Sequence, residues 1–228
     1  MQGPGSVHRI AVWDLPVRLF HWVLATFVVF SWITGKVGGD WLAWHMRSGY
    51  LILVLLIFRL AWGLAGSDTA RFASFVRGPA VTLAYARELV TQRRLHRVGH
   101  NPLGGWMVAF MLAMLLLQAT SGLFADDEIA TRGPLVAKVS EEFVAKMSSI
   151  HYYNGWLIAG LVGLHLTAIS TFHWVLRVNL VGRMVHGTML SDSPAPSPRQ
   201  GSLVLAAVLF ALASAAVWWL VIVFPKTP

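Results

Sequence analysis

Four of the nine histidines of this 228-residue chain lie in or at the edge of long, nearly uncharged stretches: His21, His45, His151 and His165. Placing an ionisable side chain inside a membrane costs free energy, so the first hypothesis for such a residue is a functional role. Neutral imidazole is a strong ligand for transition metals. The four histidines therefore predict metal ligation in apolar surroundings.

The spacing of these histidines predicts how they pair. His151 and His165 are 14 residues apart in one predicted helix. They therefore lie about 40° apart around the helix and about 21 Å apart along it, on one face at opposite depths. Matching depths place His165 beside His21 of the first span, and His151 beside His45 of the second.

Two facing pairs of imidazoles in a helical bundle are typical of bis-histidine haem ligation. We therefore predict two haem b groups, one on His21/His165 and one on His45/His151. A fully ligated iron has no open position for a substrate, which favours electron transfer. Zinc is disfavoured because the two pairs are too far apart for one closed four-ligand site. A cofactor-free role remains open, with each histidine an interfacial or hydrogen-bonded residue.

Glycines accompany the four histidines: Gly49, Gly155, Gly160 and Gly163. Such positions give a flat macrocycle room to approach a helix. Close packing between helices explains small residues in membrane helices equally well. Both interpretations stay open at this point.

The elements that position these residues are membrane spans. Hydrophobic residues make up 56% of the chain and charged residues 12%, about half the usual charged share of roughly 25%. Several uncharged stretches approach or exceed the roughly 18 to 20 residues that cross a bilayer. The predicted fold is all-α: an integral membrane four-helix di-haem bundle with one additional C-terminal transmembrane helix.

The predicted bundle domain covers residues 1–190, and residues 191–228 form a proline-rich linker followed by the extra helix. The expected spans are about 17–36, 43–66, 102–125 and 148–176 in the first part and about 201–224 in the second. Because the chain has no cysteine, any redox centre must use other ligands, without a thiolate-held cluster or covalent haem.

The charges predict the orientation. With the N-terminus inside, twelve of the 18 Lys and Arg residues fall on the cytoplasmic side. The positive-inside rule thus predicts a multi-pass protein with a cytoplasmic N-terminus and a periplasmic C-terminus. The net charge of +8 follows this topology, so the lipid bilayer is the predicted partner and nucleic acid is not.

Four segments of the sequence resemble a known family. They are residues 13–22 (WDLPVRLFHW), 44–49 (WHMRSG), 99–104 (GHNPLG), and His151 through Gly155 to His165. The chain resembles, over about residues 10–190, the cytochrome b subunits of bacterial Ni,Fe-hydrogenases and prokaryotic cytochrome b561-like proteins. It is more distantly similar to formate dehydrogenase cytochrome subunits.

The resemblance implies a di-haem b cytochrome of the bacterial inner membrane. Such a protein carries respiratory-chain electrons between a periplasmic partner, a cytochrome c or a hydrogenase-type protein, and the quinone pool. The four histidines would be its axial ligands. In related subunits a quinone lies near the inner haem at the start of the third span, which implies Asn101 and His100 here.

Arg18 and Arg47 lie close to proposed ligands and either bind haem propionates or serve orientation and snorkelling. Two other functions remain open beside an electron-transfer component of an oxidoreductase system. One is a stand-alone enzyme that oxidises superoxide and reduces quinone, with Arg47 and Lys36 at an exposed haem edge. The other is a transporter or anchor without haem.

Overall fold

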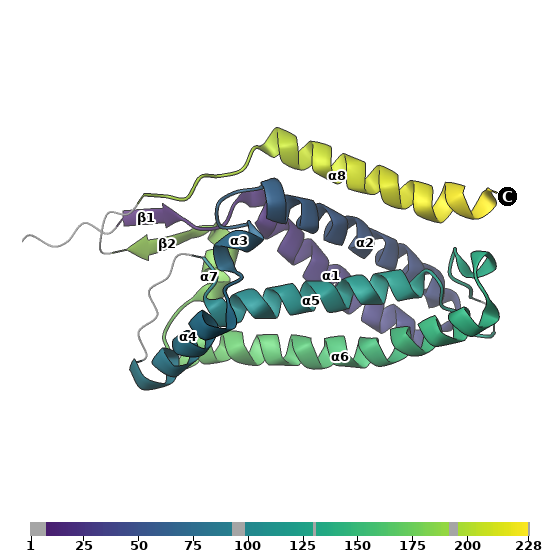
Figure 1. Cartoon of the computed structure of the whole chain (residues 1–228), viewed down its shortest axis with the longest axis horizontal. Coiled ribbons are helices and arrows are strands. Elements are labelled where there is room, and N and C mark those ends of the chain that lie inside the picture. The colour runs from purple at the N-terminus through teal and green to yellow at the C-terminus, as the bar shows by residue number, and fades with distance from the viewer. Residues whose placement is uncertain (1–7, 93–98, 130, 192–195, 228) are drawn as a thin grey trace, which may run out of the picture. The chain divides into compact units, whose positions relative to one another are not determined.

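The computed structural model describes residues 8–92, 99–129, 131–191 and 196–227 and is predominantly helical (Figure 1). In this described part, five helices are long and apolar enough to cross a membrane. They are α1 (Leu15–Val37), α2 (Leu42–Ala65), α5 (Pro102–Gly122), α6 (Glu141–Trp174) and α8 (Leu203–Trp218). The fold is an all-α membrane fold, as the composition predicts. Residues 192–195 of the predicted linker lie outside the described residues.

Helix α6 differs most from its predicted span. It begins at Glu141 rather than near residue 148 and is 34 residues long. Glu141 and Glu142 occupy its first turn, where acidic side chains are stabilised by the helix dipole. A helix of this length measures about 51 Å, well beyond a hydrocarbon core of roughly 30 Å. Part of α6 must therefore tilt or extend beyond the apolar layer.

Short elements connect the long helices. Helices α3 (Phe72–Phe75) and α4 (Pro79–Gln92) follow α2, and α7 (Leu180–His186) follows α6. Strands β1 (His8–Ala11) and β2 (Thr188–Ser191) pair antiparallel, with Ile10 opposite Met189. This pair joins the segment before α1 to the segment after α7 (Figure 1).

The chain folds into two compact units. Unit 1 consists of residues 1–19, 61–109 and 164–206, and unit 2 of residues 20–60, 110–163 and 207–228. His45 and His151 both belong to unit 2. His21 belongs to unit 2 and His165 to unit 1.

In unit 1, Asp14 fixes the start of α1. One carboxylate oxygen accepts the backbone N–H of Val17 at 2.7 Å, which is the usual bond of a helix N-cap. The other accepts the indole N–H of Trp62 at 2.9 Å. Asp14 is 3% exposed and Trp62 fully buried, so this charged group is buried with its hydrogen bonds satisfied.

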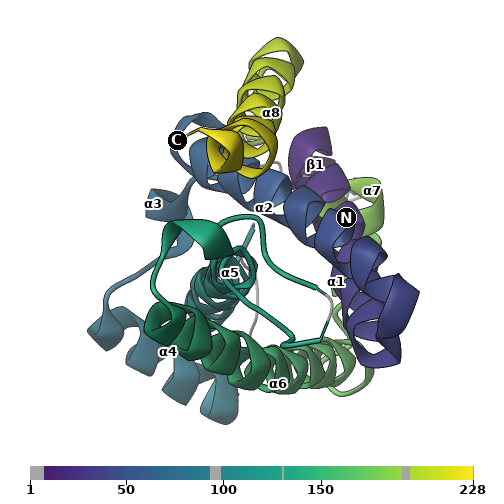
Figure 2. The same ribbon diagram turned by 90° about the vertical axis from the view of Figure 1, so that its right-hand side faces the viewer.

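In unit 2, the C-terminal helix is attached to the rest of the unit. α8 lies alongside α2 in both views (Figures 1 and 2), and the rings of Phe58 and Phe210 meet edge to face at 6.0 Å. Near the C-terminus, the carbonyl of Thr227 accepts a hydrogen bond from the Lys138 ammonium, which also lies 5.7 Å from the centre of the Phe224 ring. Most of the predicted extra span, from residue 207 on, is therefore part of this unit.

Candidate functional site

His45, in the first turn of α2, is held by α1. Its Nδ1 lies 2.8 Å from the carbonyl oxygen of Ser31 and 3.2 Å from the Ser31 hydroxyl. A carbonyl oxygen only accepts, so Nδ1 carries the ring proton and Nε2 keeps its lone pair. The absence of a side chain at Gly35 leaves room for the His45 ring, because a β-carbon there would lie 2.8 Å from Nδ1.

His151, on α6, is held by α5 in the same manner. Its Nδ1 lies 3.0 Å from the carbonyl oxygen of Gln118 and 3.3 Å from the Ser121 hydroxyl. A β-carbon at Gly122 would lie 2.8 Å from Cε1 of the ring. Two unrelated stretches of sequence thus provide each histidine with a backbone acceptor, a hydroxyl and a glycine.

A polar network fixes the α5–α6 side of this arrangement. The Gln118 side chain donates to the backbone carbonyl of His151 at 3.0 Å. Asn154, which is 6% exposed, donates to the Gln118 side-chain oxygen and to the carbonyl of Met114, both at 2.9 Å. His151 is therefore restrained through its ring and through its backbone.

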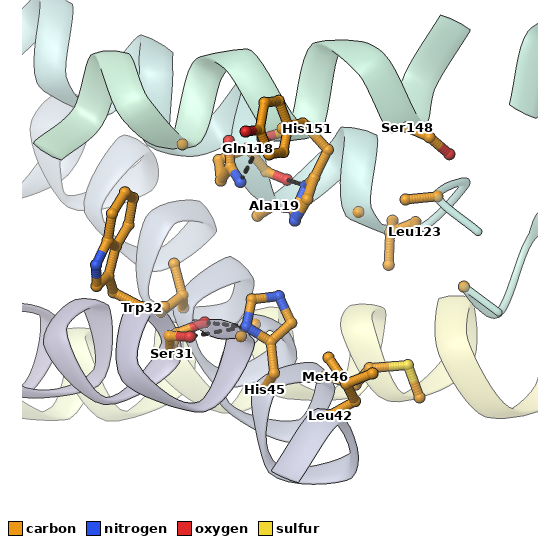
Figure 3. Close-up of a pocket in the computed structure, with 18 of the residues that line it drawn as sticks. Ser31, Trp32, Leu42, His45, Met46, Gln118, Ala119, Leu123, Ser148 and His151 are labelled. Atoms are coloured by element: carbon orange, nitrogen blue, oxygen red, sulfur yellow. Dashed lines mark hydrogen bonds between the residues drawn. The ribbon is translucent and has the colours of Figure 1, made fainter. Parts of the chain in front are cut away.

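The two imidazoles face each other across a gap (Figure 3). Their ring centres are 5.9 Å apart and their planes are inclined by 88°. If one metal ion bonded both Nε2 atoms at about 2 Å, a typical metal–imidazole distance, the ring centres would lie roughly 6 Å apart. The separation thus suits two axial ligands of one metal. A backbone acceptor on the other ring nitrogen is also the usual environment of a metal-bound histidine.

The histidines line a cavity of about 400 Å³ within unit 2, a volume in the range of small-molecule and cofactor sites. Segments of α1, α2, α5 and α6 form its wall, and Gly49 and Gly155 belong to the lining. Apart from the neighbouring backbone of its own helix, nothing lies within 4 Å of a β-carbon built on Gly49. Close packing against another helix therefore does not account for glycine at this position, whereas the open space beside it is consistent with a ligand.

The two histidines suit a metal-containing group that needs only two ligands from the protein. Among the described residues, no group of three or more His, Asp or Glu side chains gathers where it could hold a metal ion. Two facing imidazoles in an apolar cavity would suit haem, which takes few of its ligands from the protein. The residues at this site fit the predicted cofactor.

His21 and His165 lie in different units, and their predicted pairing stays a prediction. The His21 ring meets Trp22 edge to face at 4.9 Å. His165 is half-buried. Gly160 and Gly163 are exposed, and apart from the neighbouring backbone of their own helix nothing lies within 4 Å of a β-carbon built at either position.

The two predicted arginines make other contacts. Arg18 donates to the carbonyl of Val185 at the end of α7 and lies against Gly187. Arg47 is exposed, and its guanidinium lies 4.9 Å from the centre of the Trp44 ring. Arg47 is not among the residues that line the cavity. Their predicted role in binding propionates stays a prediction.

Asn101 and His100 have structural contacts in unit 1. The Asn101 side-chain oxygen accepts the backbone N–H of Gly104 at 2.7 Å and so caps the start of α5. The His100 ring lies between Trp13 and Phe75, at 4.5 and 4.7 Å. The quinone contact implied for these two residues stays a prediction.

The sequence reasoning missed the residues that orient the histidines. Gln118 was detectable, since it is a lone amide in an apolar run and polar side chains in a span usually have a function. The carbonyls of Ser31 and Gln118 leave no signal in a sequence, because every residue carries one.

Three curated relatives match most of the chain. Each is named as a probable Ni/Fe-hydrogenase B-type cytochrome subunit: that of Cupriavidus necator is 24% identical, that of Azotobacter chroococcum mcd 1 is 23% and that of Azotobacter vinelandii is 24%. The alignments cover 80–82% of this chain and 87–91% of the relatives. No solved structure matches the chain significantly.

A family model described as prokaryotic cytochrome b561 matches residues 12–187. This range contains α1, α2, α5 and α6 with all four predicted ligands. It covers well over half of the chain. The chain therefore belongs to the prokaryotic cytochrome b561 family and is a b-type membrane cytochrome.

Proposed function

We propose that this chain is a di-haem b cytochrome that carries electrons between a periplasmic redox protein and the quinone pool of a bacterial inner membrane. The observation that supports it best is the pair His45 and His151. Their rings face each other at 5.9 Å, and both keep Nε2 unprotonated by donating Nδ1–H to a carbonyl. This is the environment that an axial iron ligand requires.

Haem, when bound, supplies reversible one-electron chemistry at its iron. His45 and His151 would hold it through Nε2, while the carbonyls of Ser31 and Gln118 keep both rings oriented. Two histidine ligands would leave no position for a substrate, which suits electron transfer. His21 and His165 would hold a second haem at the other depth, so that the two groups form a relay across the membrane.

The names of the curated relatives support a hydrogenase-type protein as the periplasmic partner, and a cytochrome c is the other candidate. The proposed orientation has the N-terminus in the cytoplasm, as the arginine and lysine distribution predicts. It puts the His45–His151 site near the periplasmic partner. Quinone would then react near the cytoplasmic haem, beside His100 and Asn101.

A pyridine haemochrome assay on the purified full chain tests this proposal. We expect two non-covalent b haems per chain with low-spin bis-histidine spectra. Replacing His45 or His151 with alanine should remove one haem, and replacing His21 or His165 should remove the other. His173→Ala is the matched control, since His173 is an exposed histidine of the same helix α6. A folded, colourless wild-type protein would refute the proposal.

A second assay distinguishes the partnered relay from the alternative, a stand-alone enzyme that oxidises superoxide and reduces quinone. Superoxide-driven quinone reduction by the isolated chain, with no partner present, would favour that enzyme. If the isolated chain is inactive but reduces quinone when a reduced hydrogenase or cytochrome c is added, the partnered relay is supported.

A further inference from the structure

Lys36, in the last turn of α1, lies at the wall of the cavity that contains His45 and His151. Its ammonium is 4.2 Å from the centre of a Trp156 ring, 5.1 Å from Trp32 and 5.8 Å from Tyr152. All three aromatic residues also line the cavity, and Trp32 is visible beside it in Figure 3. Cation–π attraction to several rings holds an ammonium in place without neutralising its charge.

The charged side chains that line the cavity differ in their ion-pair and hydrogen-bond partners. Lys36 is the one lysine or arginine among the lining residues, whereas Asp126 and Asp127 are the lining acids. Asp126 is paired with Arg132 at 2.8 Å. The Asp127 carboxylate accepts backbone N–H groups of Ile129 and Thr131 at 3.0 and 2.8 Å. Among the described residues, the Lys36 cation has no carboxylate within ion-pair distance.

A haem carries two propionate carboxylates at one edge of an otherwise apolar ring. In this largely apolar cavity, Lys36 attracts a carboxylate and Asp127 repels one, while the charge of Asp126 is offset by Arg132. A restrained ammonium loses little conformational freedom on binding an anion, which strengthens the interaction. We propose that Lys36 binds a propionate of the haem held by His45 and His151. This inference rests on the proposed function, because it requires that haem.

The inference differs from the prediction made from sequence spacing. Spacing makes Arg47, two residues after His45, a candidate propionate ligand. The guanidinium of Arg47 stacks on Trp44 and the residue does not line the cavity. Lys36 is nine residues before His45 and reaches the cavity from another helix.

Optical redox titration of the full chain in detergent tests the role of Lys36. Lys36→Met removes the charge with little change of volume, and Lys36→Arg retains it. Because a nearby cation disfavours the oxidised iron, we expect Lys36→Met to lower the midpoint potential of one haem only. Lys36→Arg should stay near the wild-type value. Lys146→Met, at an exposed lysine of α6, is the control and should change neither potential.

Reconstitution with haem dimethyl ester, whose propionates are uncharged, separates direct pairing from a through-space effect. The measured quantity is the ratio of each protein's affinity for haem to its affinity for the ester. This ratio should be roughly fivefold larger for wild type than for Lys36→Met. An equal preference for haem over the ester in the two proteins, or equal midpoint potentials with haem itself, would overturn the assignment of Lys36. Failure of the proposed function is distinguishable, because the wild-type chain would then contain no haem.

Discussion

The substitution Gly122→Ala tests whether the His151 ring occupies the position of an axial ligand. An added β-carbon would lie 2.8 Å from Cε1 and 3.1 Å from Nδ1 of the ring. Non-bonded carbon atoms prefer about 3.5–4.0 Å, so the ring must move by roughly 0.7 Å or more. It is also bonded to the Gln118 carbonyl at 3.0 Å, and that hydrogen bond would be distorted.

The magnitude follows from the cost of overpacking. Such a contact costs about 1–3 kcal/mol, and each 1.4 kcal/mol is tenfold in an equilibrium constant, so haem binding should weaken roughly 5- to 150-fold. The assay is the haem content of the purified variant, followed by the rate of haem transfer to apomyoglobin. Gly35→Ala should weaken the same haem, since its β-carbon would lie 2.8 Å from Nδ1 of His45.

The control is Gly78→Ala, which adds a methyl group where no protein atom lies within 4 Å. It should retain both haems. The reasoning is refuted if Gly122→Ala and Gly35→Ala both keep full haem content, wild-type spectra and slow haem loss. It is also refuted if the two variants affect different haems, because both glycines border one pair of rings.

Two further substitutions test the framework of the site, with thermal unfolding in detergent as the measurement. Asp14→Ala removes the N-cap of α1 and leaves the buried indole N–H of Trp62 without its acceptor, so we expect a loss of about 2–4 kcal/mol. Asp14→Asn should recover part of it, and a wild-type melting temperature for Asp14→Ala would contradict the assigned role. Gln118→Leu removes the side-chain amide but keeps the backbone carbonyl that orients His151. It should lower stability by about 1–2 kcal/mol with haem content unchanged, and loss of haem would show that the side chain orients the ring.

The sequence was sufficient to predict the long apolar helices and the approach of His45 to His151. A bilayer requires about 20 apolar residues per span, so the spans stand out in composition alone. Regular helix geometry then converts the 14 residues between His151 and His165 into a difference in depth. His45 and His151 were expected at one depth, and their rings are 5.9 Å apart.

The contacts of the charged and polar candidates were not predictable from spacing. Arg18 bonds to the carbonyl of Val185, which is 167 residues away in the sequence. Asn101 caps α5, a common role for asparagine that a motif does not distinguish from ligand binding. Lys36, which only the stand-alone-enzyme alternative put at an exposed haem edge, is exposed and lies against rings from α1 and α6.

The sequence by itself determined which segments form helices long and apolar enough to cross a membrane, and it predicted that His45 and His151 meet, because hydrophobicity and helical rise act locally along the chain. Only the tertiary structure decided how the imidazoles of His45 and His151 are oriented. Their protons are fixed by the backbone carbonyls of Ser31 and Gln118. A carbonyl is the same in every residue, so its role arises only where two helices bring it beside a particular ring.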